Sequence, residues 1–81
     1  GFAGTYDLGP VEIEVYEQDG VLRAQPGDQV STRLLYQGEM RFIAEHDPQI
    51  EFIFEAANGQ AAALTLRNRG RAMPPAKRVA N

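Results

Sequence analysis

Cysteine and tryptophan are absent from this 81-residue chain, and serine and histidine occur once each. Without cysteine, the chain can form neither a disulfide nor a thiolate nucleophile. No run of eighteen apolar residues is present, so the sequence predicts no membrane insertion. A signal peptide and an initiator methionine are also missing, and we therefore expect a processed product or a piece of a longer protein.

The two residues that most often carry hydrolytic chemistry lack the neighbours that such chemistry needs. Ser31 is the only serine, and neither a Gly-x-Ser-x-Gly elbow nor a Ser-x-x-Lys motif surrounds it. His46 is the only histidine, and the turn signal Asp47-Pro48 beside it favours a place in a turn over a role as base or metal ligand. We predict that the domain is not an enzyme, and we assign it no catalytic, cofactor-binding or metal-binding residue and no cofactor.

Charge is unevenly distributed along the chain. The net charge is −3, but residues 1–66 hold eleven acids and three arginines, whereas residues 67–81 hold five basic residues and no acid. The two parts therefore carry −8 and +5. A basic segment can bind phosphate, but no aromatic residue alternates with Arg67, Arg69 and Arg71 to stack bases, so we predict no nucleic-acid partner.

Four acids between Glu12 and Asp19 form a row in the first alternating segment. The spacing of a calcium loop is missing, which favours outward-pointing strand carboxylates over a metal site. We expect the basic C-terminal segment to lie beside this acidic hairpin, with Arg67 or Arg69 near Glu12 or Glu14, and to help close the sheet.

Turn signals recur about every ten residues, which is typical of an all-β meander, sandwich or barrel. Asp-Gly and Asn-Gly are strong signals for two-residue hairpins, because both turn residues must tolerate positive φ. The signals are Gly9-Pro10, Asp19-Gly20, Pro26-Gly27-Asp28, Gln37-Gly38, Asp47-Pro48, Asn58-Gly59 and Arg69-Gly70.

Between these turns apolar and polar residues alternate, as in an antiparallel sheet with one buried face. The alternation predicts that Leu22, Phe42, Phe52 and Leu64 are buried. Further residues that share a face within their segments are Val30, Thr32, Leu34 and Tyr36 in one, and Ala62, Leu64 and Leu66 in another.

Two stretches also contain helix-forming residues, but glycine or proline interrupts both. Asn58-Gly59 breaks "EAANGQAAAL", and Gly70 and Pro74-Pro75 break "LRNRGRAMPPAKRV". We predict one domain over residues 1–81, an all-β small antiparallel meander barrel or half-barrel of seven or eight strands with little or no helix. The tail from Met73 to Asn81 is expected to form a short final edge strand.

Phe2, Gly4 and Tyr6 share one face of the first extended segment. Two aromatic residues around a glycine predict a strand in which Gly4 relieves a sharp bend and a ring covers its bare backbone.

Aromatic residues could either line a ligand cavity or fill the interior of the predicted barrel. Eight-stranded barrels do both, but a chain this short favours a filled interior. The residues concerned are Tyr6, Tyr36, Phe42, Phe52 and Phe54.

The order of motifs resembles a known family. "FAGTY" is followed by "DGVLRAQ", "LLYQGEMRF", "IEFIFEAANGQAAALTLRNRGR" and a closing "AKRV". This order is similar to that of the lipocalin-like C-terminal domain of unknown function on bacterial serine β-lactamase-like hydrolases and some peptidases. The positions that carry the resemblance are Phe2, Gly4, Tyr6, Asp19, Gly20, Leu22, Glu39, Phe42, Phe52, Gly59, Leu64, Gly70, Ala76 and Arg78.

The resemblance implies a non-catalytic accessory domain that packs on or gates a catalytic unit, or mediates assembly. The implied partner is the catalytic domain of the same protein or a second copy of this domain, and the implied location is the periplasm or the exterior of the cell. The alternative is a stand-alone mini-barrel that binds a small ligand. The family often has a proline after its central leucine, where this chain has Leu34-Leu35-Tyr36.

Overall fold

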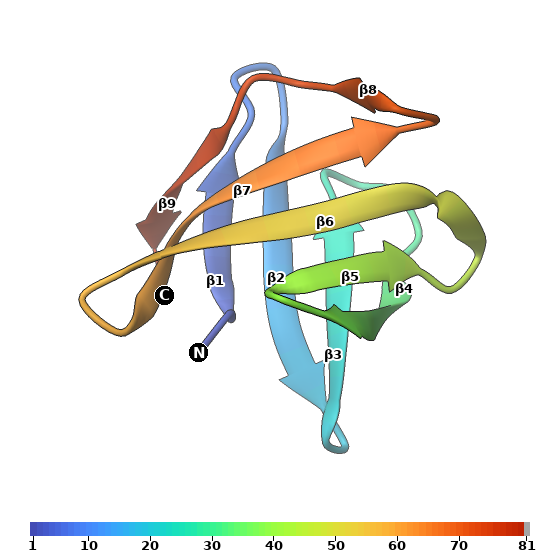
Figure 1. The fold of residues 1–81 in the computed structure, drawn as a ribbon, viewed down its shortest axis with the longest axis horizontal. Coiled ribbons are helices and arrows are strands. Elements are labelled where there is room, and N and C mark those ends of the chain that lie inside the picture. Colours follow the sequence, from blue (N-terminus) through green and yellow to red (C-terminus); the bar gives the residue numbers. More distant parts are fainter. Residues whose placement is uncertain (81) are drawn as a thin grey trace.

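The computed structural model describes residues 1–80, which form nine strands and no helix (Figure 1). The prediction of an all-β fold is therefore confirmed. The strands are β1 (Gly4–Asp7), β2 (Glu12–Gln18), β3 (Val21–Pro26), β4 (Thr32–Gly38), β5 (Arg41–Ala44), β6 (Asp47–Ala57), β7 (Gln60–Asn68), β8 (Arg71–Ala72) and β9 (Ala76–Ala80).

Eight of these strands close into an antiparallel meander barrel. Neighbours along the sheet follow the order β6-β5-β4-β3-β2-β1-β9-β7, and pairing between β6 and β7 closes the ring. The two-residue strand β8 adds to the end of β7. The predicted small meander barrel is confirmed in its closed form, with a shape like that of a small lipocalin.

Three of the predicted hairpin turns form where the sequence places them. Asp19-Gly20, Asn58-Gly59 and Arg69-Gly70 all have positive φ at both positions, for example 55° at Asp19 and 78° at Gly20. Such turns match the right-handed twist of the strands that they join.

Two other turns each lie two positions away from the prediction. The β4–β5 turn is formed by Glu39 and Met40, with φ values of 54° and 63°, and not by Gln37-Gly38. This happens because Gly38 ends β4 at an irregularity in the β4–β5 ladder.

The β5–β6 turn is Glu45-His46, so Asp47-Pro48 begins β6. Pro48 fits there because the register jumps from the pair Ala44↔Asp47 to Ile43↔Glu51, which leaves the proline outside the β5 ladder.

The barrel interior is filled with side chains from all around the sheet. Burial of Phe42, Phe52 and Leu64 is confirmed, whereas Leu22 is only half-buried because it packs against the core from the wall of an open groove. The buried apolar residues are Tyr6, Ile13, Val15, Ala24, Leu34, Phe42, Ala44, Phe52, Phe54, Ala61, Leu64 and Ala76.

Irregular pairing moves other residues off the expected face. A bulge between Glu55 and Ala56 shifts the β6–β7 register, so Ala61 is buried and Ala62 is exposed. Val30 precedes β4 and is 89% exposed, and Tyr36 near the end of β4 is 61% exposed.

The C-terminal strand β9 is one of the barrel strands, with a neighbour on each side, and not the predicted edge strand. Met73-Pro74-Pro75 separates β8 from β9, and β9 then pairs with β7 on one side and β1 on the other. The pairs Asp7↔Lys77 and Ala63↔Lys77 place Lys77 between both neighbours. The part of the prediction that falls on Asn81 lies outside the described residues.

Candidate functional site

An apolar cavity opens at the barrel end where β3 finishes and β4 begins. Its volume is about 250 Å³. Its polar lining comes from Gln29, Thr32, His46 and Asn68, and its apolar lining from Leu8, Val11, Pro26, Val30, Ile50, Phe52, Leu66 and Met73.

His46 reaches this cavity from the Glu45-His46 turn, as the turn interpretation predicts. Its Nδ1 lies 2.8 Å from the hydroxyl of Thr32. That hydroxyl also donates to the carbonyl of Arg33 at 3.3 Å. The contact fixes the position of the imidazole at the cavity.

Ser31, the other residue considered for hydrolytic chemistry, has a different hydrogen-bond partner. The guanidinium of Arg23 donates to Ser31 Oγ from Nε at 3.3 Å and Nη2 at 3.2 Å. His46 is engaged by Thr32, so serine and histidine do not form a nucleophile–base pair in this structure. Among residues 1–80, no cluster of three metal-ligating side chains occurs.

The predicted pairing of Arg67 or Arg69 with Glu12 or Glu14 is wrong. The β6–β7 hairpin sets Arg67 directly opposite Glu51, and Arg67 Nε donates to the Glu51 carboxylate. The acids of β2 remain on an exposed strand face, as the interpretation of outward carboxylates predicts.

Glu51 is held between two arginines on the outer face of the barrel. Arg41 on β5 donates to its second oxygen at 2.8 Å, opposite the bond from Arg67 on β7. These two hydrogen bonds hold the pKa of the Glu51 carboxyl below its usual range, and the bond from Arg67 has the larger effect. Arg69 makes a further ion pair with Asp47 at 3.2 Å. Arg67 and Arg69 are therefore matched by acids of β6.

Gly4 is covered by an arginine and not by the predicted aromatic ring. A Cβ at Gly4 would lie 2.6 Å from Arg78 Nε and 2.8 Å from the carbonyl oxygen of Ala80. The bare backbone of Gly4 therefore makes room for Arg78 on β9, since Tyr6 points into the core instead.

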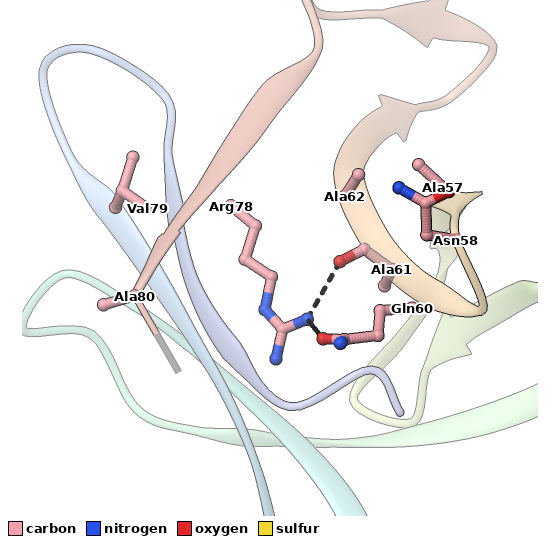
Figure 2. Close-up of a pocket in the computed structure, with 8 residues that line it drawn as sticks. All are labelled: Ala57, Asn58, Gln60, Ala61, Ala62, Arg78, Val79 and Ala80. Carbon is pink, nitrogen blue, oxygen red and sulfur yellow. Dashed lines mark hydrogen bonds between the residues drawn. The ribbon is translucent and has the colours of Figure 1, made fainter.

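Figure 2 shows Arg78 extended across an open pocket toward the start of β7. Its Nη1 donates to Gln60 Oε1 at 2.9 Å and to the carbonyl of Ala61 at 3.1 Å. Its Nη2 donates to the carbonyl of Ala3 at 2.7 Å. Arg78 thus connects β9 with the start of β7 and with the segment before β1, which is a structural role.

Aromatic rings pack against one another inside the barrel. Phe54 lies 4.8 Å from Phe2, 5.6 Å from Phe42 and 5.7 Å from Tyr6, measured between ring centroids. The Tyr6 hydroxyl donates to the carbonyl of Phe2 at 2.7 Å. Burial raises the pKa of this hydroxyl, and the positive charge of Arg78 offsets part of that rise. Of the five candidate aromatics only Tyr36 is exposed, and it lies in a groove that the buried Phe42 also lines.

That groove is the feature that the sequence did not reveal. It lies between β3 and β4 at the end of β3 opposite the cavity, and its volume is about 750 Å³. Its lining includes Phe2, Glu17, Leu22, Leu35 and Tyr36.

The chain matches no protein-family model, no curated protein and no solved structure. A helix long and apolar enough to cross a membrane is not found in residues 1–80.

Proposed function

We propose that the chain is a non-catalytic accessory domain of a bacterial β-lactamase-like serine hydrolase or peptidase. In this proposal it packs on the catalytic unit of the same protein through the barrel end that carries the apolar cavity. The motif resemblance supplies the parent class, together with a periplasmic or secreted location. Side chains fill the barrel interior, which supports a role for the outer surface.

The observation that carries this proposal is the exposed apolar rim of the cavity. Val30 is 89% exposed and Met73 is 45% exposed, although both are large apolar side chains. Both line the same hollow beside Leu8 and Ile50. Exposed apolar surface that gathers around a concavity is typical of a docking site.

The test uses the full-length protein encoded by the gene that contains this chain. Val30→Asp with Met73→Asp should leave the barrel folded and release it from the catalytic unit. Amide hydrogen exchange would show the release as lost protection around Val30 and Met73. Val79→Asp is the matched control, because Val79 is a large apolar side chain, 55% exposed, in a different pocket. Equal amide exchange around Val30 and Met73 in the parent and in the double variant would refute docking through this end of the barrel.

The catalytic part of the proposal has its own test. The isolated 81-residue domain should not turn over a chromogenic β-lactam or a p-nitrophenyl ester. Turnover that disappears on Ser31→Ala or His46→Ala would show that the domain is itself an enzyme.

The second candidate is a mini-barrel that binds a small apolar ligand in the cavity. The enclosed volume of about 250 Å³ with Thr32, His46 and Asn68 among apolar walls favours it. Titration of the isolated domain with indole, followed by NMR, separates the candidates. Saturable shifts at Thr32, His46 and Phe52 that Phe52→Leu alters would support a ligand site, and no shift would leave docking as the function.

A further inference from the structure

The ladder between β3 and β4 ends early, although both strands continue. It contains two residue pairs and stops at Arg23↔Arg33, whereas β3 begins at Val21 and β4 runs on to Gly38. Beyond this point the strands separate, and Figure 1 shows the lower part of the β2–β3 hairpin projecting from the barrel. The groove described above occupies this open seam.

The peptide groups of Leu34 and Tyr36 both face β3, and that of Tyr36 lies beyond the last residue pair. The N–H of Glu45 donates to the carbonyl of Arg33 at 2.9 Å, so the peptide of Arg33 faces β5. Antiparallel pairing alternates the direction of peptide groups, which turns those of Leu34 and Tyr36 toward β3. The Tyr36 carbonyl accepts from the side-chain amide of Gln37 at 3.2 Å. Because Arg33 faces β5, the pair Arg23↔Arg33 is held by bonding between Leu22 and Leu34, so the edge that remains for an incoming strand lies beyond Leu34, at Tyr36.

Apolar side chains flank this edge. The groove is lined by Phe2, Leu22, Leu35, Tyr36 and Phe42. The Tyr36 ring, 61% exposed, packs 5.1 Å from the ring of Phe42. Proteins usually protect an apolar strand edge against pairing with other chains, with charges, prolines or a covering segment. An open edge with apolar flanks is the arrangement that binds alternate side chains of an extended peptide.

The charges of the groove indicate which peptide fits. Arg23 and Arg33 lie directly opposite each other where the ladder stops, and like charges in such positions repel. Arg23 bonds to the neutral hydroxyl of Ser31, and Arg33 reaches the half-exposed Glu45 only at 3.6 Å. This end of the groove therefore has an excess of positive charge, and Glu17 gives the other end a negative charge.

We propose that the open β3–β4 seam binds an extended peptide segment by strand addition. The peptide has apolar residues at alternate positions, and an acidic residue at one end meets Arg23 and Arg33. Its main chain pairs with the edge of β4 beyond Leu34, at Tyr36. The site is independent of the docking end, because the groove and the cavity lie at opposite ends of β3.

The test is an NMR titration of the isolated 81-residue domain with three peptide pools. The first pool contains capped hexapeptides with Val, Ile, Leu or Phe at alternate positions, Thr between them and Glu at either end. The second has Lys in place of Glu. The third repeats the first with N-methyl groups on alternate amides, which blocks strand pairing and preserves the side chains.

The acidic pool should shift the amides of Val21, Leu22, Leu34 and Tyr36, and the N-methylated pool should not. Weaker binding of the Lys pool would confirm the charge preference. No shift at millimolar concentration with any pool, or equal shifts with the N-methylated pool, would overturn the proposal. Shifts of the same amides that depend on protein concentration without peptide would also overturn it, since a second copy would then occupy the seam.

Charge reversal distinguishes recognition from nonspecific attraction. The double variant Arg23→Glu with Arg33→Glu should invert the preference, favouring the Lys pool over the Glu pool by about tenfold. Arg71→Glu on the exposed strand β8 is the control and should leave the preference of the parent unchanged. If the double variant keeps the parent's preference, the two arginines do not recognise the peptide.

Discussion

The β6–β7 seam and the β3–β4 seam belong to the same barrel, but they are paired to very different extents. The ladder between β6 and β7 contains eight residue pairs, whereas the ladder between β3 and β4 contains two. Both seams join strands that are consecutive in the chain. The difference therefore comes from how the strands curve, since the β2–β3 hairpin leaves the barrel where β4 continues around it.

The two seams also differ in the charges that lie on the outer face of the barrel. At the closed seam Glu51 lies opposite Arg67 and also binds Arg41, so opposite charges are paired. At the open seam Arg23 lies opposite Arg33, so like charges are paired. One seam is therefore held by opposite charges across it, whereas the other places like charges opposite each other.

The largest expected effect comes from removing a ring beneath the closed seam. Phe52 is 2% exposed, so Phe52→Ala should lower the free energy of unfolding by about 3–5 kcal/mol. A loss of this size approaches the total stability of a small domain. Urea denaturation measures it.

Tyr36→Ala at the open seam is the matched aromatic control and should cost at most about 1 kcal/mol. Equal losses for the two variants would contradict the distinction between the seams.

A smaller effect is expected from the carboxylate at the closed seam. Because the pKa of Glu51 is lowered on folding, its contribution to stability is present above the unfolded pKa, about 4.3. It is lost as the pH falls through the lowered folded value. Glu51→Gln should therefore be less stable than the parent at neutral pH, and the two should converge below the folded pKa.

Urea midpoints between neutral and strongly acidic pH would show this convergence. Glu55→Gln, at an exposed glutamate of the same strand, tests whether removing any β6 carboxylate has the same effect. A difference between parent and Glu51→Gln that stays constant with pH would mean that the ion pairs do not stabilise the seam.

The smallest effect is expected at the open seam. Arg23→Glu replaces a like-charge pair by an opposite-charge pair with Arg33, and should stabilise the free domain by about 0.2–1 kcal/mol. The gain should shrink as salt is raised to about 1 M, because exposed charges are screened. Arg71→Glu makes the same change in net charge at another exposed position. An equal gain in this control would show that only net charge matters.

Local signals in the sequence predicted the strands and several turns correctly. Asp19-Gly20 and Asn58-Gly59 form hairpin turns because adjacent positive φ values suit Asp, Asn and Gly. The alternation around Phe42 and Phe52 predicted their burial because one face of each strand meets the core.

Features that depend on register around the barrel were not accessible from the sequence. The partner of Arg67 is Glu51, sixteen residues earlier, and that pairing follows from a hairpin bulged at Ala56. The arginine that covers Gly4 comes from the last strand. The open seam gives no local signal, since residues on either side of it alternate as they do in closed ladders.

Amide hydrogen exchange of Tyr36 and Ile53 in the isolated domain tests the difference between the seams most directly. Arg69 N–H donates to Gln49, so the odd-numbered peptides of β6, including that of Ile53, face β7. The Ile53 amide should exchange only on global unfolding, and the Tyr36 amide at least about 100-fold faster. Addition of the acidic peptide pool should slow the exchange of the Tyr36 amide and leave the exchange of the Ile53 amide unchanged. Equal protection of the two amides without peptide would show that the β3–β4 seam is closed and would contradict this account.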